Sequence, residues 1–303
     1  MTQTFKLNGI SKQSDLLRLC DIDKEIFKKA LTELYNCYYK KTKTGKNRLV
    51  EQPNDYLKEI LRRINNVFQE LKCSDYCYCG WKGLNNIKNA EAHAKNQNII
   101  TLDISAFFPN TKAEYVENFF AEKLGISGEA LSTLVNLTTF NGHLPTGAPT
   151  STILSCLVHQ DIFDDIKAKM AENSIKMTVY VDDITLSSHK HIGNWAITYC
   201  KNAVKKHGLW IKTSKIKRFG YKNAWITGVR LNQAGQKCVP YALDFAVIKI
   251  LKEKAIEEMT ERDVQKLLGK IGYIQQISPD KFETTKRKLI KRLKEVMNTT
   301  QNA

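Results

Sequence analysis

Two adjacent carboxylates, Asp182 and Asp183, lie inside the stretch "KMTVYVDDITLSS", which is otherwise rich in β-branched and aromatic residues. Asp is disfavoured in β-strands, so the pair is expected to have a specific role. Two divalent cations held about 4 Å apart can transfer a nucleotidyl group, because one activates the attacking hydroxyl while the other stabilises the leaving group. Mg²⁺ prefers oxygen ligands, commonly one or two carboxylates and substrate phosphates. The pair is therefore a candidate site for metal-assisted nucleotidyl transfer.

A third carboxylate is needed, because neighbouring side chains at the tip of a hairpin point to opposite faces of the ribbon. Asp103, in "NIITLDISAFF", follows a run of β-branched residues and would emerge at the end of a buried strand. The alternative is that Asp182 and Asp183 are ordinary turn residues and that Asp103 only ends a strand, since Asp is common in turns. The three acids together favour the metal site over this alternative.

Hydrophobic periodicity predicts the elements that position these acids. A strand is expected to end near Asp103, and a strand pair is expected over 176–188. A long helix over 150–170 is entered from the loop "GHLPTGAPT", and Asn54 or Asp55 is expected to cap another helix. The remaining expected elements are helices over 24–39, 56–72, 113–125, 130–140 and 193–208, a basic hairpin over 40–53, a short strand over 224–232 and mainly helical structure from Tyr241.

The chain carries 47 Lys and Arg against 31 Asp and Glu, a formal net charge of +16. Such an excess favours a polyanionic partner, either nucleic acid or an anionic membrane surface. No apolar run approaches the roughly 20 residues of a membrane span, and the N-terminal stretch lacks the apolar segment of a signal peptide. We therefore expect a cytoplasmic protein with no membrane partner, in which the 8 cysteines are thiols rather than disulfides.

The stretch "CSDYCYC" concentrates three of these cysteines, Cys73, Cys77 and Cys79. They could supply thiolate ligands to zinc, but no second Cys pair follows at finger-like spacing, and His93 is the nearest downstream histidine. Packing of the thiols in the interior is the favoured interpretation. Whether they bind anything stays open.

Four motifs in order resemble those of reverse transcriptases. Tyr180-Val181-Asp182-Asp183 resembles the tetrad that carries the paired acids, and "LDISAFFPN" is similar to the motif with the other catalytic aspartate. "LPTGAPTSTILSCL" resembles the loop and helix that line the nucleotide pocket, and "GLWIKTSKIKRF" resembles the element that follows. The resemblance implies an RNA-directed DNA polymerase with an α+β, right-hand fold of fingers, palm (an antiparallel sheet backed by helices) and helical thumb.

The same resemblance divides the chain into three parts. Residues 1–95 would form N-terminal helices and fingers, 96–235 the palm with the catalytic motifs and part of the fingers, and 236–303 a helical, basic thumb. The positive thumb would contact the phosphates of the primer-template duplex without reading sequence.

Two less conspicuous elements narrow the resemblance to retron reverse transcriptases. "NAEAH", from Asn89 to His93, matches the Asn-Ala-x-x-His element of these enzymes, and "ITG", from Ile226 to Gly228, differs from their Val-Thr-Gly element by one residue. Two alternatives stay open. One is a reverse transcriptase of another lineage, such as a group II intron relative or a stand-alone defence polymerase. The other is a non-catalytic RNA-binding protein.

The resemblance assigns the catalytic and metal-binding roles. Asp103 and Asp182 would bridge two Mg²⁺ ions, Asp183 would complete the site, and the backbone carbonyl of Ile104 would add an oxygen. Lys215 matches the lysine proposed to protonate the departing pyrophosphate.

Four further residues match positions that contact the incoming nucleotide. Lys46 and Arg48 correspond to fingers residues that grip the triphosphate, for which the fork of an Arg is well suited. A solvated charged turn is an equal alternative for Lys46. Gly147 would let the backbone approach the nucleotide closely, whereas Thr146 stands where many reverse transcriptases have Gln, which puts a contact from its side chain in doubt.

Phe108, five residues after Asp103, matches the aromatic residue that lies under the sugar and excludes a 2′-hydroxyl. The alternative for Phe107 and Phe108 is core packing. Because adjacent strand residues face opposite ways, at most one of the two rings is expected to serve as this gate.

The retron elements assign recognition of the enzyme's own structured RNA to Asn89, His93, Thr227 and Gly228. A lone His is more often a satisfied structural residue, so a structural role for His93 stays open. The resemblance further implies deoxynucleotide substrates, a cognate non-coding RNA template, priming from the 2′-hydroxyl of an internal guanosine, a branched RNA–DNA product (multicopy single-stranded DNA), and anti-phage defence with a separate effector protein.

Overall fold

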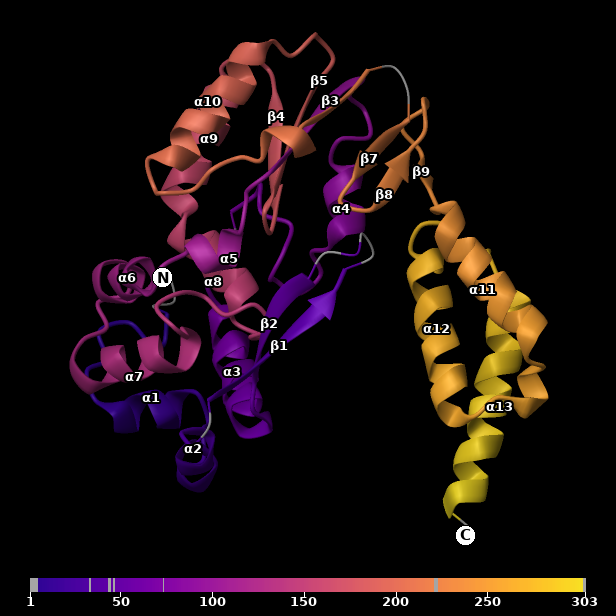
Figure 1. The fold of residues 1–303 in the computed structure, drawn as a ribbon, viewed down its shortest axis with the longest axis horizontal. Helices are drawn as coiled ribbons and strands as arrows, with labels where there is room; N and C mark the ends of the chain where they lie inside the picture. Colours follow the sequence, from indigo (N-terminus) through magenta and orange to yellow (C-terminus); the bar gives the residue numbers. More distant parts are fainter. Residues whose placement is uncertain are drawn as a thin grey trace. The chain divides into compact units, whose positions relative to one another are not determined.

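The computed structural model describes residues 5–32, 34–42, 45, 47–72, 74–220 and 223–301. The chain divides into two compact units, and helices and strands are mixed along it (Figure 1). The first unit combines Met1–Asn85, Ile100–Leu186 and Ile192–Lys217, and the second combines Asn86–Ile99, Ser187–His191 and Arg218–Ala303. Each unit therefore gathers segments that are distant in the sequence.

A sheet with strand order β4-β5-β3-β6 carries the predicted acids. Its strands are β3 (Asn98–Asp103), β4 (Lys176–Tyr180), β5 (Asp183–Ser188) and β6 (Lys217–Phe219). Helix α9 (Gln160–Ala171) packs along β4, and α10 (Asn194–Lys205) packs on α9 (Figure 1). The strand that ends at Asp103 and the strand pair around the two adjacent acids are thus confirmed.

The first unit contains a hairpin and further helices besides this sheet. The antiparallel hairpin of β1 (Tyr35–Lys41) and β2 (Asn47–Pro53) confirms the expected basic hairpin. Asn54 caps α3, since its side chain accepts the Leu57 N–H at 2.7 Å. The helical elements of this unit other than α9 and α10 are α1 (Gln13–Leu19), α2 (Lys24–Ala30), α3 (Asp55–Phe68), α5 (Phe107–Asn110), α6 (Ala113–Asn118), α7 (Gly128–Thr138), α8 (Ser151–Val158), the π-helical turn Phe119–Lys123 and the 3₁₀ turn Thr213–Lys215.

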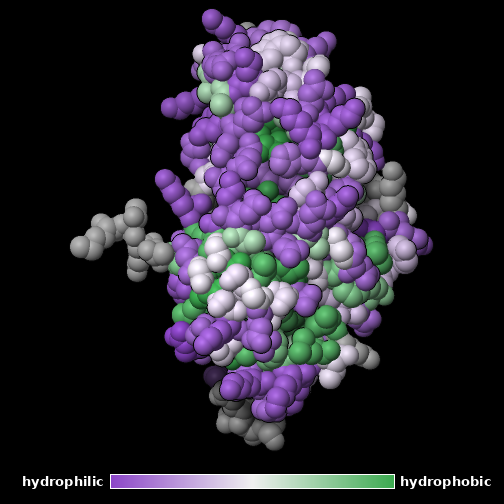
Figure 2. Space-filling view, turned by 90° about the vertical axis from the view of Figure 1, so that its left-hand side faces the viewer, coloured by the Kyte–Doolittle hydropathy of each residue, from purple (hydrophilic) through white to green (hydrophobic). Residues whose placement is uncertain are grey.

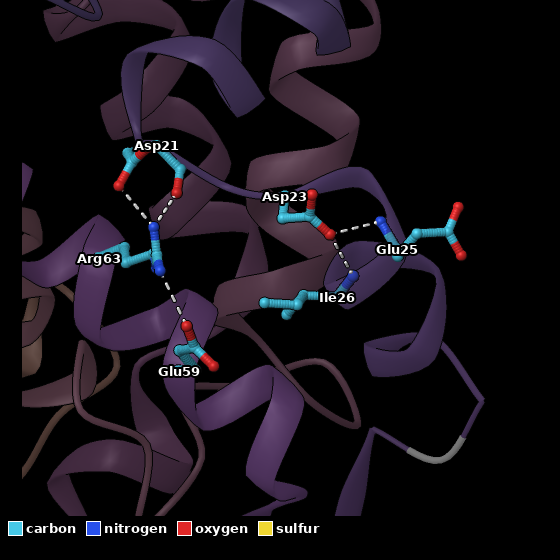
Figure 3. A network of polar contacts seen from close by, with 6 residues as sticks. All are labelled: Asp21, Asp23, Glu25, Ile26, Glu59 and Arg63. Carbon is cyan, nitrogen blue, oxygen red and sulfur yellow. Dashed lines mark hydrogen bonds and ion pairs between the residues drawn. The ribbon is translucent and has the colours of Figure 1, made fainter.

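Polar contacts fix the start of α2 against α3 (Figure 3). The Asp23 side chain caps α2 by accepting the N–H groups of Glu25 and Ile26 at 2.8 and 3.0 Å. Arg63, on α3, pairs with Asp21 at 2.6 Å and with Glu59 at 2.9 Å. Asp21 has a φ of 54°, a conformation that is unfavourable for a residue other than glycine. The Arg63 guanidinium therefore stabilises a strained turn.

The second unit joins a small sheet to a helical group. Its strands β7 (Ala224–Ile226), β8 (Val229–Leu231) and β9 (Lys237–Cys238) form an antiparallel three-stranded sheet. Helix α4 (Asn86–Glu91) packs on β7 and β8. The helices α11 (Tyr241–Glu253), α12 (Glu261–Gln275) and α13 (Glu283–Gln301) pack on one another, with the 3₁₀ turn Ile256–Glu258 between the first two (Figure 1).

Three expected elements differ from the structure. The helix predicted over 24–39 ends at Ala30, and the aromatic-rich stretch that follows pairs as β1 instead. The helix over 150–170 is two helices, because His159 (φ −104°, ψ 18°) leaves the helical conformation between α8 and α9. The single strand over 224–232 is the β7–β8 hairpin.

Much of the visible surface is hydrophilic. Figure 2 shows hydrophilic residues over much of one face, with hydrophobic residues gathered at the level of α6 and α7. No helix among the described residues is both long enough and apolar enough to cross a membrane. None of the cysteines that the structure describes forms a disulfide, and Cys73 lies outside the described residues.

Candidate active site

The paired acids lie at a two-residue turn between β4 and β5. Val181 and Asp182 form this turn, and β5 begins at Asp183. Val181 has a φ of 58°, which is a strained conformation for a β-branched residue. Strain of this kind persists only where the surroundings enforce it, and it is common at functional sites.

Backbone hydrogen bonds bring Asp103 to this turn. The N–H of Ile104 donates to the carbonyl of Asp182 at 2.8 Å. On the other side of the same strand end, the N–H of Lys212 donates to the carbonyl of Asp103 at 2.9 Å, and Ile104 forms an antiparallel bridge with Ile211. The structure thus places the predicted acids of two separate motifs at one strand edge.

The three acids influence one another electrostatically. Burial, followed by the charges of Asp182 and Asp103, raises the pKa of Asp183 to about 7. Burial and the Asp103 charge also raise the pKa of Asp182, whereas Lys215 and Arg48 oppose the rise. Partly buried carboxylates that repel one another are stabilised by a cation between them.

Lys215 supplies a positive charge directly at these acids. It ends the 3₁₀ turn Thr213–Lys215, and its ammonium lies 2.5 Å from a carboxylate oxygen of Asp103. The Asp103 side chain is 15% exposed, so this ion pair is only partly open to water. The structure therefore places the predicted proton donor at the predicted metal ligand.

The donor set suits Mg²⁺ in kind, because all three side chains offer hard carboxylate oxygens. As they stand, no group of three His, Cys, Asp or Glu side chains in the described part of the chain is arranged to hold a metal ion. The Lys215 ammonium neutralises Asp103 in this arrangement. The carbonyl of Ile104 belongs to a residue that is 1% exposed beside these acids.

Arg48 reaches the electrostatic range of the same site. It lies on the exposed part of β2, opposite Lys40 in the hairpin. Its charge lowers the pKa of Asp182, although burial outweighs this effect. Lys46 lies outside the described residues.

Phe108 lies in a short helix and not in a strand. Ala106, with a φ of 47°, turns the chain out of the strand direction, and α5 follows from Phe107. Phe107 is buried and stacks on Phe108, with ring centroids 6.2 Å apart, while Phe108 is only half-buried. The alternation argument for these two rings was therefore wrong, but the burial still leaves Phe108 as the ring nearer to solvent.

The loop with Thr146 and Gly147 is bound to β2 by Glu51, a residue that the motifs do not include. Glu51 is 2% exposed, and its carboxylate accepts the Thr146 N–H at 3.0 Å and pairs with His143 Nε2 at 3.0 Å. Gly147 has a φ of 140°, and a Cβ atom there would lie 2.8 Å from the Glu51 carbonyl oxygen. Only glycine fits this close approach without a shift of the backbone.

A protein-family model identifies the family to which this chain belongs. The model described as reverse transcriptase (RNA-dependent DNA polymerase) matches residues 39–241, more than half of the chain. The chain belongs to this family. The matched span includes all three acids, Lys215 and Arg48, and membership of the family implies the polymerase fold.

Curated relatives of this reverse transcriptase family member are retron enzymes. The retron Ec73 reverse transcriptase of Escherichia coli is 26% identical over 279 residues, covering 84% of this chain and 87% of that protein. The retron Ec48 reverse transcriptase of Escherichia coli is 25% identical over 271 residues, covering 81% and 66%. The retron Se72 reverse transcriptase of Salmonella heidelberg (strain 579083-10) is 27% identical over 158 residues, covering 51% and 42%. The match thus spans less than two thirds of the length of the Ec48 and Se72 enzymes. The three similarities confirm the predicted resemblance to retron reverse transcriptases.

The two elements that suggested retrons lie together in this family member, mostly in the interior. Asn89 is fully buried and donates to the Thr227 hydroxyl at 3.3 Å. His93 is also fully buried, 2.6 Å from the Ser187 hydroxyl. Thr227 is half-buried and Gly228 is exposed, and they form the β7–β8 turn. The burial supports the structural role for His93 and gives Asn89 an internal role, whereas RNA contact by Thr227 and Gly228 stays a prediction.

Proposed function

We propose that this protein is a retron-type reverse transcriptase that adds deoxynucleotides to a DNA end on an RNA template. The observation that carries the proposal is the meeting of Asp103, Asp182 and Asp183 at one strand edge in a chain of the reverse transcriptase family. The basic composition, with a net charge of +16, suits a nucleic-acid template and product.

Two Mg²⁺ ions held by these three acids, with the Ile104 carbonyl as a further oxygen, would lower the pKa of the attacking hydroxyl and neutralise charge on the leaving pyrophosphate. The protein's own groups do the rest. Lys215, whose ammonium pairs with Asp103, would give its proton to the pyrophosphate oxygen as the bond breaks. Arg48 binds phosphate oxygens of the triphosphate through its fork.

The nucleotide pocket selects deoxynucleotides in this proposal. The half-buried ring of Phe108 lies under the sugar and leaves no room for a 2′-hydroxyl. Gly147 gives the nucleotide access to the backbone, and Glu51 and His143 hold that loop in place. A contact from Lys46 and from the Thr146 side chain is part of the same proposal.

The division into fingers, palm and thumb follows the family. Residues 1–95 would form the N-terminal helices and fingers, 96–235 the palm around the β4-β5-β3-β6 sheet with part of the fingers, and 236–303 the thumb. The three packed helices α11 to α13 and their Lys and Arg residues support the last assignment, since a basic helical group suits a nucleic-acid duplex.

The similarity to retron enzymes supports a more specific proposal about the template, primer, product and partner. The template would be the enzyme's cognate non-coding RNA, the primer an internal guanosine 2′-hydroxyl, and the product branched, multicopy single-stranded DNA joined to RNA. A separate effector protein would act with this complex in anti-phage defence in the cytoplasm. The names of the relatives and the two retron elements support the retron type, and these further details are what the resemblance to retron enzymes implies.

The activity is tested by primer extension on an RNA template with Mg²⁺. Replacing both acids, as Asp182→Asn with Asp183→Asn, should abolish DNA synthesis and leave RNA binding largely intact. The matched control is Asp164→Asn with Asp165→Asn, an adjacent and exposed acid pair on α9, which should extend like the unmodified protein. Full extension by the first double variant would refute the assignment.

The retron reading has its own test. The protein is purified from its host, and the bound nucleic acid is treated separately with RNase and DNase. A branched species that contains both polymers supports the proposal. RNA alone in an active host contradicts it.

A further inference from the structure

The segment that contains Cys77 and Cys79 lies beside the strand that leads into the paired acids. The Val179 N–H donates to the Tyr76 carbonyl at 2.8 Å, and the Tyr78 N–H donates to the Val179 carbonyl at 2.9 Å. Cys77 and Val179 form a parallel bridge. The segment therefore acts as a further backbone partner of β4 next to the catalytic turn.

Helix α8 holds the other side of this segment. Gly80 has a φ of +85°, and a Cβ atom there would lie 3.1 Å from the Ile153 Cα atom. Such a close approach fixes the chain directly after Cys79 against the helix. Cys79 is thus held between β4 and α8 and has little freedom to move.

The Cys79 sulfur makes a hydrogen bond to the catalytic turn. The N–H of Val181 donates to Cys79 Sγ at 3.0 Å. This N–H belongs to the residue with the strained positive φ, directly before Asp182. A half-buried backbone donor in a tight turn needs a partner, and here the partner is a side chain 102 residues away in the sequence.

We propose that Cys79 is a positioning residue of the active site: its sulfur keeps Val181 in the left-handed conformation and so sets the direction of Asp182 and Asp183. This inference rests on the proposed function for its catalytic consequence. Cys79 does not touch the substrate or the reacting atoms. It acts through the turn that carries the acids.

The neighbours of Cys79 support its role as an acceptor. Cys77 Sγ lies 3.8 Å from Cys79 Sγ, and hydrogen bonds with Cys156, then with Cys77, then from the Val181 N–H lower the pKa of the Cys79 thiol, against the effect of burial. All three cysteines are at most 5% exposed. The Cys79 sulfur therefore lies both in a cluster of buried thiols and against the catalytic turn.

The test compares four variants of the full chain. Cys79→Ala and Cys79→Val remove the acceptor, and the second keeps most of the side-chain volume. Cys79→Ser keeps an acceptor at the same place. Cys77→Ala is the matched control, since Cys77 is buried in the same cluster, whereas the Val181 N–H donates to Cys79.

The first readout is hydrogen exchange of the backbone amides of the turn over 180–183. We expect exchange at least tenfold faster in Cys79→Ala and Cys79→Val, and near the unmodified rate in Cys79→Ser and Cys77→Ala. The second readout is steady-state primer extension. The acceptor-free variants should lose about tenfold in kcat with KM for the deoxynucleotide within twofold, and Cys79→Ser should recover most of the rate.

The outcomes separate this inference from the proposed function. Equal amide exchange in Cys79→Ala, Cys79→Val and Cys77→Ala overturns the positioning role, whatever the activity. Faster exchange in the acceptor-free variants alone supports the positioning role even if the unmodified protein makes no DNA, a result that would overturn the proposed function instead. Faster exchange with unchanged kcat in an active protein overturns the catalytic consequence.

Discussion

The β4–β5 hairpin and the β7–β8 hairpin have the same kind of turn, but the turn has a different role in each. Each has a two-residue turn whose first residue is β-branched with a positive φ, Val181 at 58° and Thr227 at 46°. In the first turn the side chains that follow are acids with unfavourable burial. In the second, the strained residue itself is held by hydrogen bonds within the second unit.

The second hairpin is satisfied internally. The Asn86 side chain donates to the Thr227 carbonyl at 3.0 Å and to the Tyr273 hydroxyl at 2.8 Å. The Thr227 hydroxyl donates to the Asn86 carbonyl at 3.3 Å and accepts from Asn89. The comparison teaches that the same strained turn can present reactive groups or serve as a structural joint, and that the surrounding hydrogen-bond partners decide which.

The largest expected effect separates the two hairpins by activity. Asp182→Asn should reduce primer extension by at least about 1000-fold, because in the proposed mechanism it removes a carboxylate that would hold both metal ions. Thr227→Val, which removes only a hydroxyl in the other hairpin, should keep extension on a generic RNA template within about tenfold. Both rates are measured under single-turnover conditions. A larger loss in Thr227→Val than in Asp182→Asn would reverse the comparison.

The next effect is a pH dependence confined to the first hairpin. Asp183, with a pKa raised to about 7, is more protonated when folded than when unfolded between about pH 4 and pH 7. In the metal-free protein, Asp183 therefore contributes to folding stability at low pH, and this contribution is lost as the pH rises through this window. Below about pH 7 the proton competes with Mg²⁺, so the apparent metal affinity should fall by up to about tenfold per pH unit.

Titration calorimetry with Mg²⁺ at several pH values, and thermal unfolding without metal, would measure these two trends. In Asp183→Asn, both pH dependences should weaken. The control Asp164→Asn should behave as the unmodified protein. A metal affinity that is flat from pH 5.5 to 7.5 would contradict the raised pKa.

The sequence alone could identify the acids but not what holds them. Asp103, Asp182 and Asp183 stand in contiguous motifs, and period-two strands place them correctly. Cys79 and Glu51 act on residues 102 and 95 positions away, and no local pattern links such partners. The cysteine cluster was visible in the sequence, and its adjacency to the tetrad required the fold.

The errors in secondary structure have the same origin. The apolar spacing of 24–39 fits a helix, but Tyr35–Lys41 gains backbone pairing with Asn47–Pro53, which local periodicity does not contain. His159 breaks the long helix where its ring bonds the Thr111 hydroxyl at 2.9 Å, a tertiary contact. In the second hairpin, Thr227-Gly228 lacks the usual Asn or Asp of a two-residue turn, which concealed the hairpin.

A third effect tests the internal role of Asn89. Asn89→Ala should lower the free energy of unfolding by about 1–3 kcal/mol, because it leaves buried polar partners unsatisfied. Urea unfolding measures this loss, and combining Asn89→Ala with Thr227→Val should give less than the sum of the two single losses. If Asn89 contacted RNA directly, the substitution would weaken RNA binding and leave stability within about 0.5 kcal/mol of the unmodified protein.

The smallest expected effect isolates the strain that both turns share. Thr227→Gly loses the hydroxyl hydrogen bonds but relieves a left-handed conformation that costs a β-branched residue about 1–2 kcal/mol, so its net stability should stay within about 1 kcal/mol of the unmodified protein. Thr227→Val keeps the strain and loses the same bonds, so it should be the less stable of the two by about 1 kcal/mol or more.

Val181→Gly relieves the same strain in the first hairpin, where the Cys79 bond to the backbone N–H remains possible. Urea midpoints of the three variants measure these differences, and a Thr227→Gly variant less stable than Thr227→Val would mean that the turn, as held by Asn86 and Asn89, carries no strain.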